Sequence, residues 1–358
     1  MAFLLARSSA LQWLRGQGPD AVELKRLGLR VLDIEADYVR IVRHKATLSS
    51  IDKPVHLLVS YRDARRRSKA ICCHLMQLPT GIYPAFMIER ALFCSAPELL
   101  MIEMATALDS DELLFLGYEL CGSYGFDEQG ELTDRGLICN ASIIGEFARK
   151  CEGVHGRKRL AAVVPHVLDG SASPMETALA ICLTMPVSKG GLGLPQPLLN
   201  HPLPVDGPAA RIWDGKSITP DLLWPFDESD ERAQVGIEAA SRSIGSDRSG
   251  REEAQMGADG ACKGVAIEYD SDENHTGGQR IARDSRRRNV LEMMGYRVIA
   301  VTNEQFADPR EFERIGVLLA HYLDVPFKEA VDEAWVARST FHAKIRGIAL
   351  NPDRLLGG

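Results

Sequence analysis

Three acidic side chains stand at the ends of two predicted strands in the second half of the chain. Glu268 and Asp270 lie two residues apart in the predicted strand 264–270, so both should project from one face of a sheet. Asp221 stands in an earlier strand candidate, 220–224. If these strands pair, the three carboxylates converge, and they repel one another unless a cation joins them. Hard oxygen ligands suit Mg²⁺ or Mn²⁺, which can polarise a phosphodiester and lower the pKa of an attacking water.

An arginine-rich helix is predicted directly after this strand, over residues 279–294. Arg280, Arg283 and Arg287 are spaced so that they share one helix face. A cationic face beside a carboxylate cluster suits a phosphate backbone, because the metal would serve the scissile phosphate and the arginines its neighbours. His275, in the loop between strand and helix, could move a proton or orient a water.

Each of these features has a simpler explanation when it is taken by itself. An acid at a strand end is more often a turn former, and an arginine-rich helix is usually a solvated face. A lone loop histidine usually has no chemical role. The order in which the features follow one another along the chain is what favours a site.

The same succession resembles the very-short-patch-repair-like branch of the PD-(D/E)xK, or restriction-endonuclease-like, nuclease superfamily. The residues that carry the resemblance are Pro220-Asp221-Leu-Leu-Trp-Pro, Val265-Ala-Ile-Glu268-Tyr-Asp270, His275, Arg283-Asp284 and Leu291-x-x-x-Gly295-Tyr-Arg-Val298. The resemblance covers residues 173–323 and implies a central mixed sheet flanked by helices, with metal-dependent cleavage of DNA. It implies that Asp221 and Glu268 are metal ligands and Asp270 an auxiliary acid. Glu176 matches an acidic position that often completes such sites.

The sequence departs from the family pattern at several places. Asp270 stands where the superfamily has a lysine, Ser271 where related sequences often have glycine, and His275 lies one residue later. Residues 227–262, rich in acids, Ser, Gly and Ala and without aromatics, separate the two ligand candidates and are predicted to be a flexible insertion. A non-catalytic DNA-binding or antitoxin-type regulatory protein that retains the nuclease fold is therefore an alternative. An RNA-cleaving nuclease with the same site is another.

The domain organisation that follows is α/β (α+β). We expect a mixed α/β regulatory or specificity domain over 1–170, an endonuclease-like domain over 171–325 and a helical extension over 326–358. The first domain loosely resembles antitoxin-like regulatory regions of the AbiEi type through its short strands and its basic connection, residues 62–69. A scaffold without recognisable chemistry is the alternative for this half.

Local patterns predict the elements that must position these residues. Residues 1–50 are predicted to be helical. Further predicted strands are 55–59, 70–75, 87–94, 209–213, 220–224, 264–270, 296–301 and one near 198, and predicted helices are 97–106, 111–118, 143–151, 158–168, 279–294, 308–319 and one that opens at Pro174. Gly295 is expected to end the arginine-rich helix.

The amino-acid composition limits the classes of protein and partner that remain. The 358 residues are 45% hydrophobic and 25% charged, as in an ordinary soluble protein. No apolar run approaches the roughly 20 residues of a membrane span, so no membrane partner is expected. A net charge of −7 disfavours a wholly basic nucleic-acid binder, although segregated charges would still allow DNA or RNA as a partner. Eight irregularly spaced cysteines predict reduced thiols in the cytoplasm rather than a disulfide or zinc framework.

Overall fold

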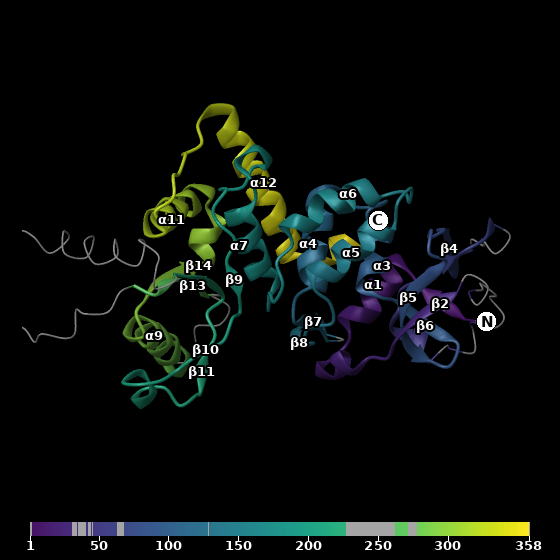
Figure 1. Ribbon diagram of the computed structural model, residues 1–358, viewed down its shortest axis with the longest axis horizontal. Coiled ribbons are helices and arrows are strands. Elements are labelled where there is room, and N and C mark those ends of the chain that lie inside the picture. The colour runs from purple at the N-terminus through teal and green to yellow at the C-terminus, as the bar shows by residue number, and fades with distance from the viewer. Residues whose placement is uncertain are drawn as a thin grey trace, which may run out of the picture. The chain divides into compact units, whose positions relative to one another are not determined.

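The chain folds into two compact units (Figure 1). Unit one is Met1–Ile181 together with Lys344–Gly358, and unit two is Cys182–Ala343. The computed structural model describes residues 2–30, 34, 41, 44, 46–62, 68–127, 129–226, 262–270 and 278–357, with the backbone alone for 278–284. Both units combine helices with sheets, which confirms the predicted α/β (α+β) class. No helix within these ranges is long and apolar enough to cross a membrane.

A six-stranded mixed sheet is the centre of unit one. Its spatial order is β2 (Arg26–Arg30), β5 (Ile82–Glu89), β6 (Leu92–Ser95), β1 (Phe3–Leu5), β3 (Val55–Val59) and β4 (Ile71–Leu75). β1 runs parallel to β6 and antiparallel to β3, and all of its residues are buried. A strand of this kind shows no alternation of apolar and polar residues. The prediction of helix over 1–50 is therefore wrong at β1, and it is also wrong at β2.

Helices accompany this sheet. The described helices are α1 (Arg7–Arg15), α3 (Pro97–Met104), α4 (Ser110–Leu120), α5 (Ala141–Lys150) and α6 (Arg157–Val163), with 3₁₀ turns at Pro19–Glu23, Thr47–Ser50, Val164–His166 and Pro352–Leu356 and a hairpin of β7 (Tyr124–Phe126) and β8 (Leu132–Asp134). Every residue of α3 is buried, so this helix belongs to the core. The cap of α4 is Asp109, whose side chain accepts from the amides of Asp111 and Glu112. Ser110 is the first residue of the helix.

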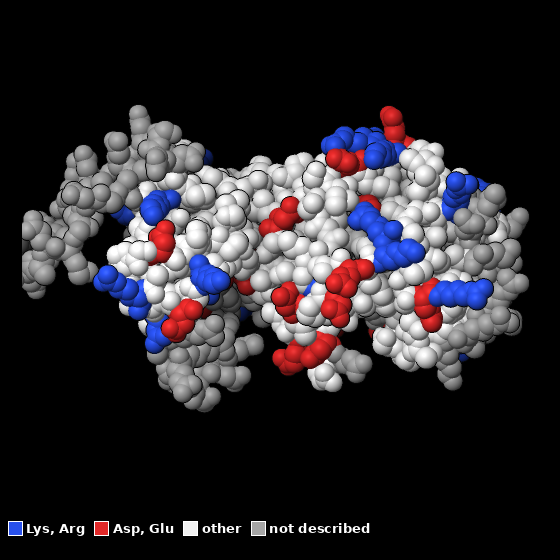
Figure 2. All heavy atoms as spheres, turned by 60° about the horizontal axis from the view of Figure 1, so that its bottom comes forward, with Lys and Arg blue, Asp and Glu red and all other residues white. Residues whose placement is uncertain are grey.

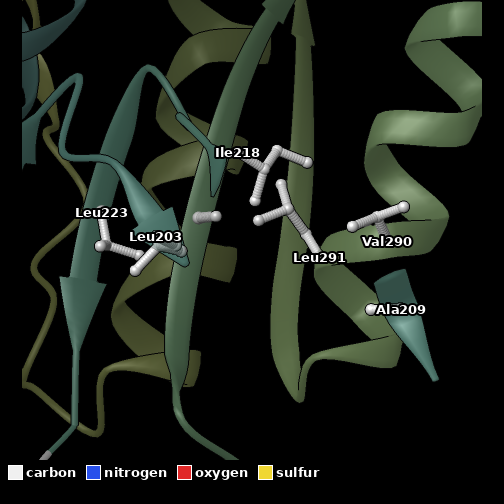
Figure 3. Packing of buried hydrophobic residues seen from close by; sticks show 7 residues of the cluster. Leu203, Ala209, Ile218, Leu223, Val290 and Leu291 are labelled. Atoms are coloured by element: carbon white, nitrogen blue, oxygen red, sulfur yellow. The ribbon is translucent and has the colours of Figure 1, made fainter. Parts of the chain in front are cut away.

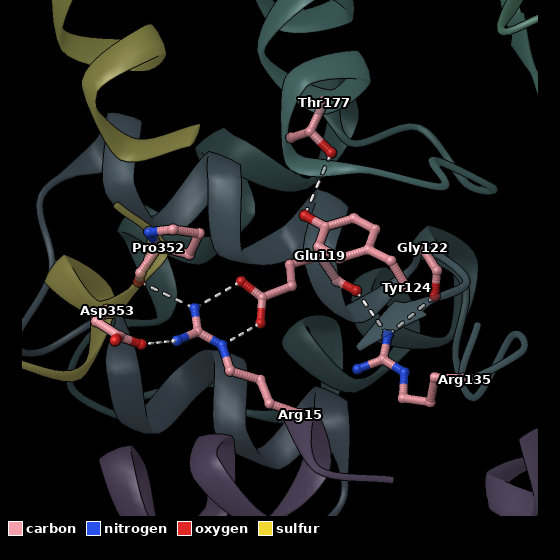
Figure 4. A network of polar contacts seen from close by, with 8 residues as sticks. All are labelled: Arg15, Glu119, Gly122, Tyr124, Arg135, Thr177, Pro352 and Asp353. Atoms are coloured by element: carbon pink, nitrogen blue, oxygen red, sulfur yellow. Dashed lines mark hydrogen bonds and ion pairs between the residues drawn. The ribbon is translucent and has the colours of Figure 1, made fainter. Parts of the chain in front are cut away.

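A buried polar network holds the last residues of the chain to unit one (Figure 4). Arg15 on α1 donates from Nε to Oε1 of Glu119 at 2.6 Å and from Nη2 to Oε2 at 2.8 Å. Nη1 of Arg15 also donates to Asp353 Oδ1 at 3.1 Å, and Nη2 to the carbonyl oxygen of Pro352 at 3.0 Å. The side chains of Arg15 and Glu119 are 6% and 0% exposed, so each neutralises a charge that water cannot reach.

Unit two is built on a four-stranded sheet in the order β14 (Tyr296–Thr302), β13 (Gly264–Asp270), β12 (Leu222–Pro225) and β9 (Leu198–Leu199). β13 is parallel to β14 and antiparallel to β12. Parallel neighbours need a crossover, and α9 (Gly278–Met293) lies between them in the chain. Gly295, at φ +95°, ends this helix as expected. The remaining elements are β10 (Leu203–Pro204), β11 (Ser217–Ile218), α10 (Asn303–Ala307) and α11 (Pro309–Tyr322).

Two helices have residues in both units, α7 (Pro174–Thr184) and α12 (Asp332–Leu350). The division of the chain therefore falls inside α7, after Ile181, rather than at residue 170. The stretch 326–358 is likewise divided, since 344–358 belongs to unit one.

One hydrophobic cluster of unit two lies between its sheet and α9 (Figure 3). Leu223 and Ala266 are paired in the β12–β13 register and pack in one cluster with Val290 and Leu291 of α9. Since side chains alternate along a strand, the positions after Ala266 that share this face are 268 and 270. The hydrophobic packing of α9 therefore decides which polar side chains of β13 its arginines can reach.

Two other local predictions differ from the structure, over residues 87–94 and 209–213. Residues 87–94 contain the end of β5 and the start of β6, separated by a turn in which Ala91 has φ +67°. Residues 209–213 contain a 3₁₀ turn, Ala209–Arg211, after Pro208 rather than a strand. The predicted insertion 227–262 lies outside the described residues except for Cys262. All eight cysteines are free thiols.

Candidate functional site

Asp221 lies where the β12–β13 ladder ends. In the register that pairs Leu222 with Ile267, position 221 faces position 268. Asp221 Oδ2 accepts a hydrogen bond from the backbone N–H of Tyr269 at 2.6 Å. This hydrogen bond extends the contact between β12 and β13 to the residue before Leu222. The residue before Asp221 is Pro220, which has no backbone N–H to donate. Asp221 is thus held beside the residue that separates Glu268 from Asp270.

Glu268 forms a two-pronged ion pair with Arg287 of α9. Arg287 donates from Nη2 to Glu268 Oε2 at 2.8 Å and from Nε to the same oxygen at 3.1 Å, with a further Nη2 contact to Oε1 at 3.1 Å. Nη2 also donates to the carbonyl oxygen of Thr219 at 2.7 Å. Glu268 is 8% exposed, so this charge-assisted pair compensates a carboxylate that has little contact with water. Arg287 also links β13 to the segment that carries Asp221.

Asp270 has a separate arginine partner. Arg288 Nη2 donates to Asp270 Oδ2 at 3.1 Å, and both side chains are half-exposed. Glu268 and Asp270 therefore both meet α9, as expected for two side chains on one face of β13. Arg288 was not among the phosphate-binding candidates, because its helical position is one residue beyond the face of Arg287.

Tyr269 lies on the opposite face of β13 and contacts two residues of α10. Its hydroxyl donates to Asn303 Oδ1 at 3.2 Å, and its ring meets that of Phe306 edge-on, with centroids 6.3 Å apart. Neither Tyr269 nor Asn303 was a candidate from the sequence. The parallel register, which pairs Asp270 with Thr302 immediately before Asn303, brings them together. Sequence spacing alone carries no sign of this contact.

Some predicted site residues are not brought to this group by the described structure. Glu176 belongs to unit one, in the first turn of α7, where its Oε2 accepts from the N–H of Ala172 at 3.0 Å. Its own N–H donates to Ser173 Oγ at 3.1 Å, so these contacts close the start of the helix. His275 lies outside the described residues, and Arg280 and Arg283 lie in the part of α9 whose side chains are not described.

The donor chemistry of the three acids fits Mg²⁺ or Mn²⁺, since both prefer carboxylate oxygen. Their charges are compensated differently in the structure, by a backbone N–H and by two guanidinium groups. In the described residues, these three acids do not each place one oxygen within 4.8 Å of the others. An ion shared by Asp221 and Glu268 would therefore require Arg287 to release at least one oxygen of Glu268.

Charge around the molecule bears on a nucleic-acid partner. Figure 2 shows one face, on which basic and acidic side chains of the described residues are interspersed. A uniformly basic surface is therefore not what this face offers, and binding of a phosphate backbone there would depend on a local group of arginines.

The comparisons with known proteins found no match among protein-family models, curated sequences or solved structures.

Proposed function

We propose that unit two is a divalent-metal-dependent endonuclease-like domain that cleaves DNA phosphodiester bonds. One observation carries the proposal: the Asp221 carboxylate accepts the N–H of Tyr269, so it lies beside the strand end that bears Glu268 and Asp270. Asp221 just before β12, Glu268 and Asp270 of β13, and two arginines of α9 thereby share one end of a mixed sheet. The resemblance of this stretch to the very-short-patch-repair-like nucleases supports the same activity.

Each residue has a distinct task in this proposal. Asp221 and Glu268 hold Mg²⁺ or Mn²⁺, and Asp270 assists them. The ion, when bound, polarises the scissile phosphate and lowers the pKa of a water. The Tyr269 N–H keeps the Asp221 carboxylate in one orientation. Arg287 holds Glu268 in place, and the guanidinium hydrogens that it frees when Glu268 binds an ion can bond a phosphate oxygen.

The tasks of the other predicted residues remain proposals from the sequence. Arg280 and Arg283 bind neighbouring phosphates, and His275 donates or positions a proton. Unit one then acts as a regulatory or specificity domain in a cytoplasmic protein.

The test is a plasmid-nicking assay with Mg²⁺ or Mn²⁺. Asp221→Asn keeps an oxygen that can accept the Tyr269 N–H but removes the negative charge, so we expect nicking to fall by about 10–100-fold or more. Asp214→Asn is the matched control, since Asp214 lies in the same unit with a fully exposed side chain. Equal nicking by Asp221→Asn, Asp214→Asn and the parent protein would end the catalytic assignment.

The arginine–glutamate pair favours a second candidate, a DNA-binding or regulatory protein that does not cleave. A carboxylate neutralised by Arg287 needs no metal for its charge to be compensated. Such a protein would bind a DNA duplex in EDTA and show no tight Mn²⁺ binding by calorimetry. Tight Mn²⁺ binding that Glu268→Gln abolishes would argue against this candidate, and equal assays on RNA and DNA would identify the preferred nucleic acid.

A further inference from the structure

Two strands of unit one bring together three side chains that commonly bind metals. In the parallel register of β3 and β4, His56 is paired with Cys72, and His74 follows Cys72 by two residues, so all three lie on one face of the sheet. Each offers one ligand atom, and these atoms all lie within 4.8 Å of one another. Among the residues that the structure describes, no other three His, Cys, Asp or Glu side chains form such a group.

The two imidazoles face one another through ring nitrogens that a metal could use. His56 Nδ1 and His74 Nε2 are 3.0 Å apart, and the ring centroids are 4.8 Å apart. Two Zn–N bonds of about 2.05 Å at a tetrahedral angle separate their nitrogens by about 3.3 Å. The separation of the nitrogens would therefore grow by only about 0.3 Å, and the rings would turn so that both lone pairs point at one ion.

We propose that His56, Cys72 and His74 bind one transition-metal ion of the zinc class. Two imidazoles and a thiolate suit a borderline-soft ion such as Zn²⁺, whereas Mg²⁺ prefers oxygen ligands. Cys72 is a free thiol, and all three side chains are half-buried, so an ion can reach them from solvent. The bound ion would join β4, at the end of the sheet order, to β3.

A cavity reaches His74, one of the three proposed ligands, and leaves room for a further ligand. His74 lines a cavity of about 420 Å³ together with Arg7, Glu103 and Thr106. Three protein ligands leave one tetrahedral position, the arrangement of zinc sites that keep a water or exchange it for another ligand. Arg7 and Glu103 bring a cationic and a carboxyl group to this cavity, so neither sign of charge dominates and the fourth ligand is a water. The site lies in unit one and does not rest on the function proposed for unit two.

Cobalt provides the first test, because Co²⁺ bound to a thiolate absorbs in the near ultraviolet through charge transfer. The metal-free full-length protein is titrated with Co²⁺ in the presence of Mg²⁺, and Zn²⁺ is then added. We expect one Co²⁺ per chain, a charge-transfer band and its loss on addition of Zn²⁺. Absence of the band, or a band that Mg²⁺ prevents, would overturn the proposal.

Variants identify the ligands. Cys72→Ala should lose the band, and His56→Ala and His74→Ala should weaken Co²⁺ binding by at least about tenfold. Cys73→Ala is the matched control, since Cys73 is the next residue of β4, on the opposite face and buried. A band that disappears in Cys73→Ala but persists in Cys72→Ala would refute the assignment.

A measurement on the unsubstituted protein avoids any folding defect of a variant. Iodoacetamide labelling of each cysteine is read by peptide mass spectrometry with and without Zn²⁺. We expect Zn²⁺ to slow the labelling of Cys72 at least about tenfold and to leave Cys262, the other half-buried thiol, unchanged. Equal labelling of Cys72 in both conditions, or equal protection of both thiols, would count against the site.

Discussion

Replacing Glu103 by Gln should make unit one less sensitive to pH. Glu103 is 1% exposed, on α3, and its Oε2 accepts the N–H of Arg7 at 2.8 Å. Ser95 Oγ has one hydrogen but lies 2.7 Å from Glu103 Oε1 and 2.9 Å from the carbonyl oxygen of Leu5. A protonated Glu103 satisfies all of these groups, because its O–H donates to Ser95 Oγ while the serine donates to Leu5. A Gln side chain can make the same contacts through its NH₂ group.

The size of the expected change in stability follows from the pKa of the Glu103 carboxyl. Burial raises the pKa of Glu103 from 4.5 to about 7, against the lowering effects of Arg7 and Ser95. The folded state therefore binds this proton more tightly than the unfolded state does. Protonation of Glu103 stabilises the folded state fully below about pH 4.5, and this stabilisation is lost as the pH rises through about 7. At about 1.36 kcal/mol per pKa unit, the difference corresponds to about 3 kcal/mol in the free energy of unfolding.

The assay is urea unfolding of the parent protein and Glu103→Gln between about pH 5 and about pH 8. The stability of the variant relative to the parent should rise by about 2–3 kcal/mol over this range, because only the parent has a carboxyl to ionise at position 103. Glu152→Gln, at an exposed site in the same unit, is the control for removal of a surface carboxylate. A pH-independent difference for Glu103→Gln would refute the reasoning.

Two further predictions concern the buried parts of the chain. Arg15→Met should lower the free energy of unfolding by about 3–5 kcal/mol, since it removes the ion-pair partner of the buried Glu119 carboxylate. Limited proteolysis should then cut sooner near Asp353, which Arg15 also contacts. No change in stability or in proteolysis would contradict the structural role of the pair. A thiol reagent should label the half-buried Cys72 and Cys262 of the metal-free native protein and reach the six buried cysteines only after unfolding, and fast labelling of more than two thiols would show that the buried ones are accessible.

Many helices and strands of unit two could be predicted because the sequence patterns that indicate them are local. Strand β13 is a short apolar run bounded by Gly264 and Asp270, and its structural bounds match the predicted ones. The end of α9 follows from Gly295, because glycine adopts the left-handed backbone at no steric cost. In unit one the same reasoning missed β1, a strand of Phe3–Leu5 whose state depends on pairing with strands far along the chain.

The candidate site could be predicted only in part. The alternation of β13 implies that Glu268 and Asp270 share a face, and α9 meets both. The contact between Asp221 and Tyr269 joins residues 48 positions apart, so it depends on a register that no local pattern contains. The partners of the arginines depend likewise on how α9 packs against the sheet.

The amino-acid sequence by itself determined the mixed α/β class, most of the helices and strands, and the order of acids and arginines, because each depends on neighbours within a few residues. Only the tertiary structure decided that Arg287 neutralises Glu268, that His56 meets His74, and that Glu103 is buried. Strand register and loss of solvent contact arise from segments distant in the chain. Those two quantities determine the pKa values, the ion pairs and the metal-binding potential of side chains whose identities were visible from the start.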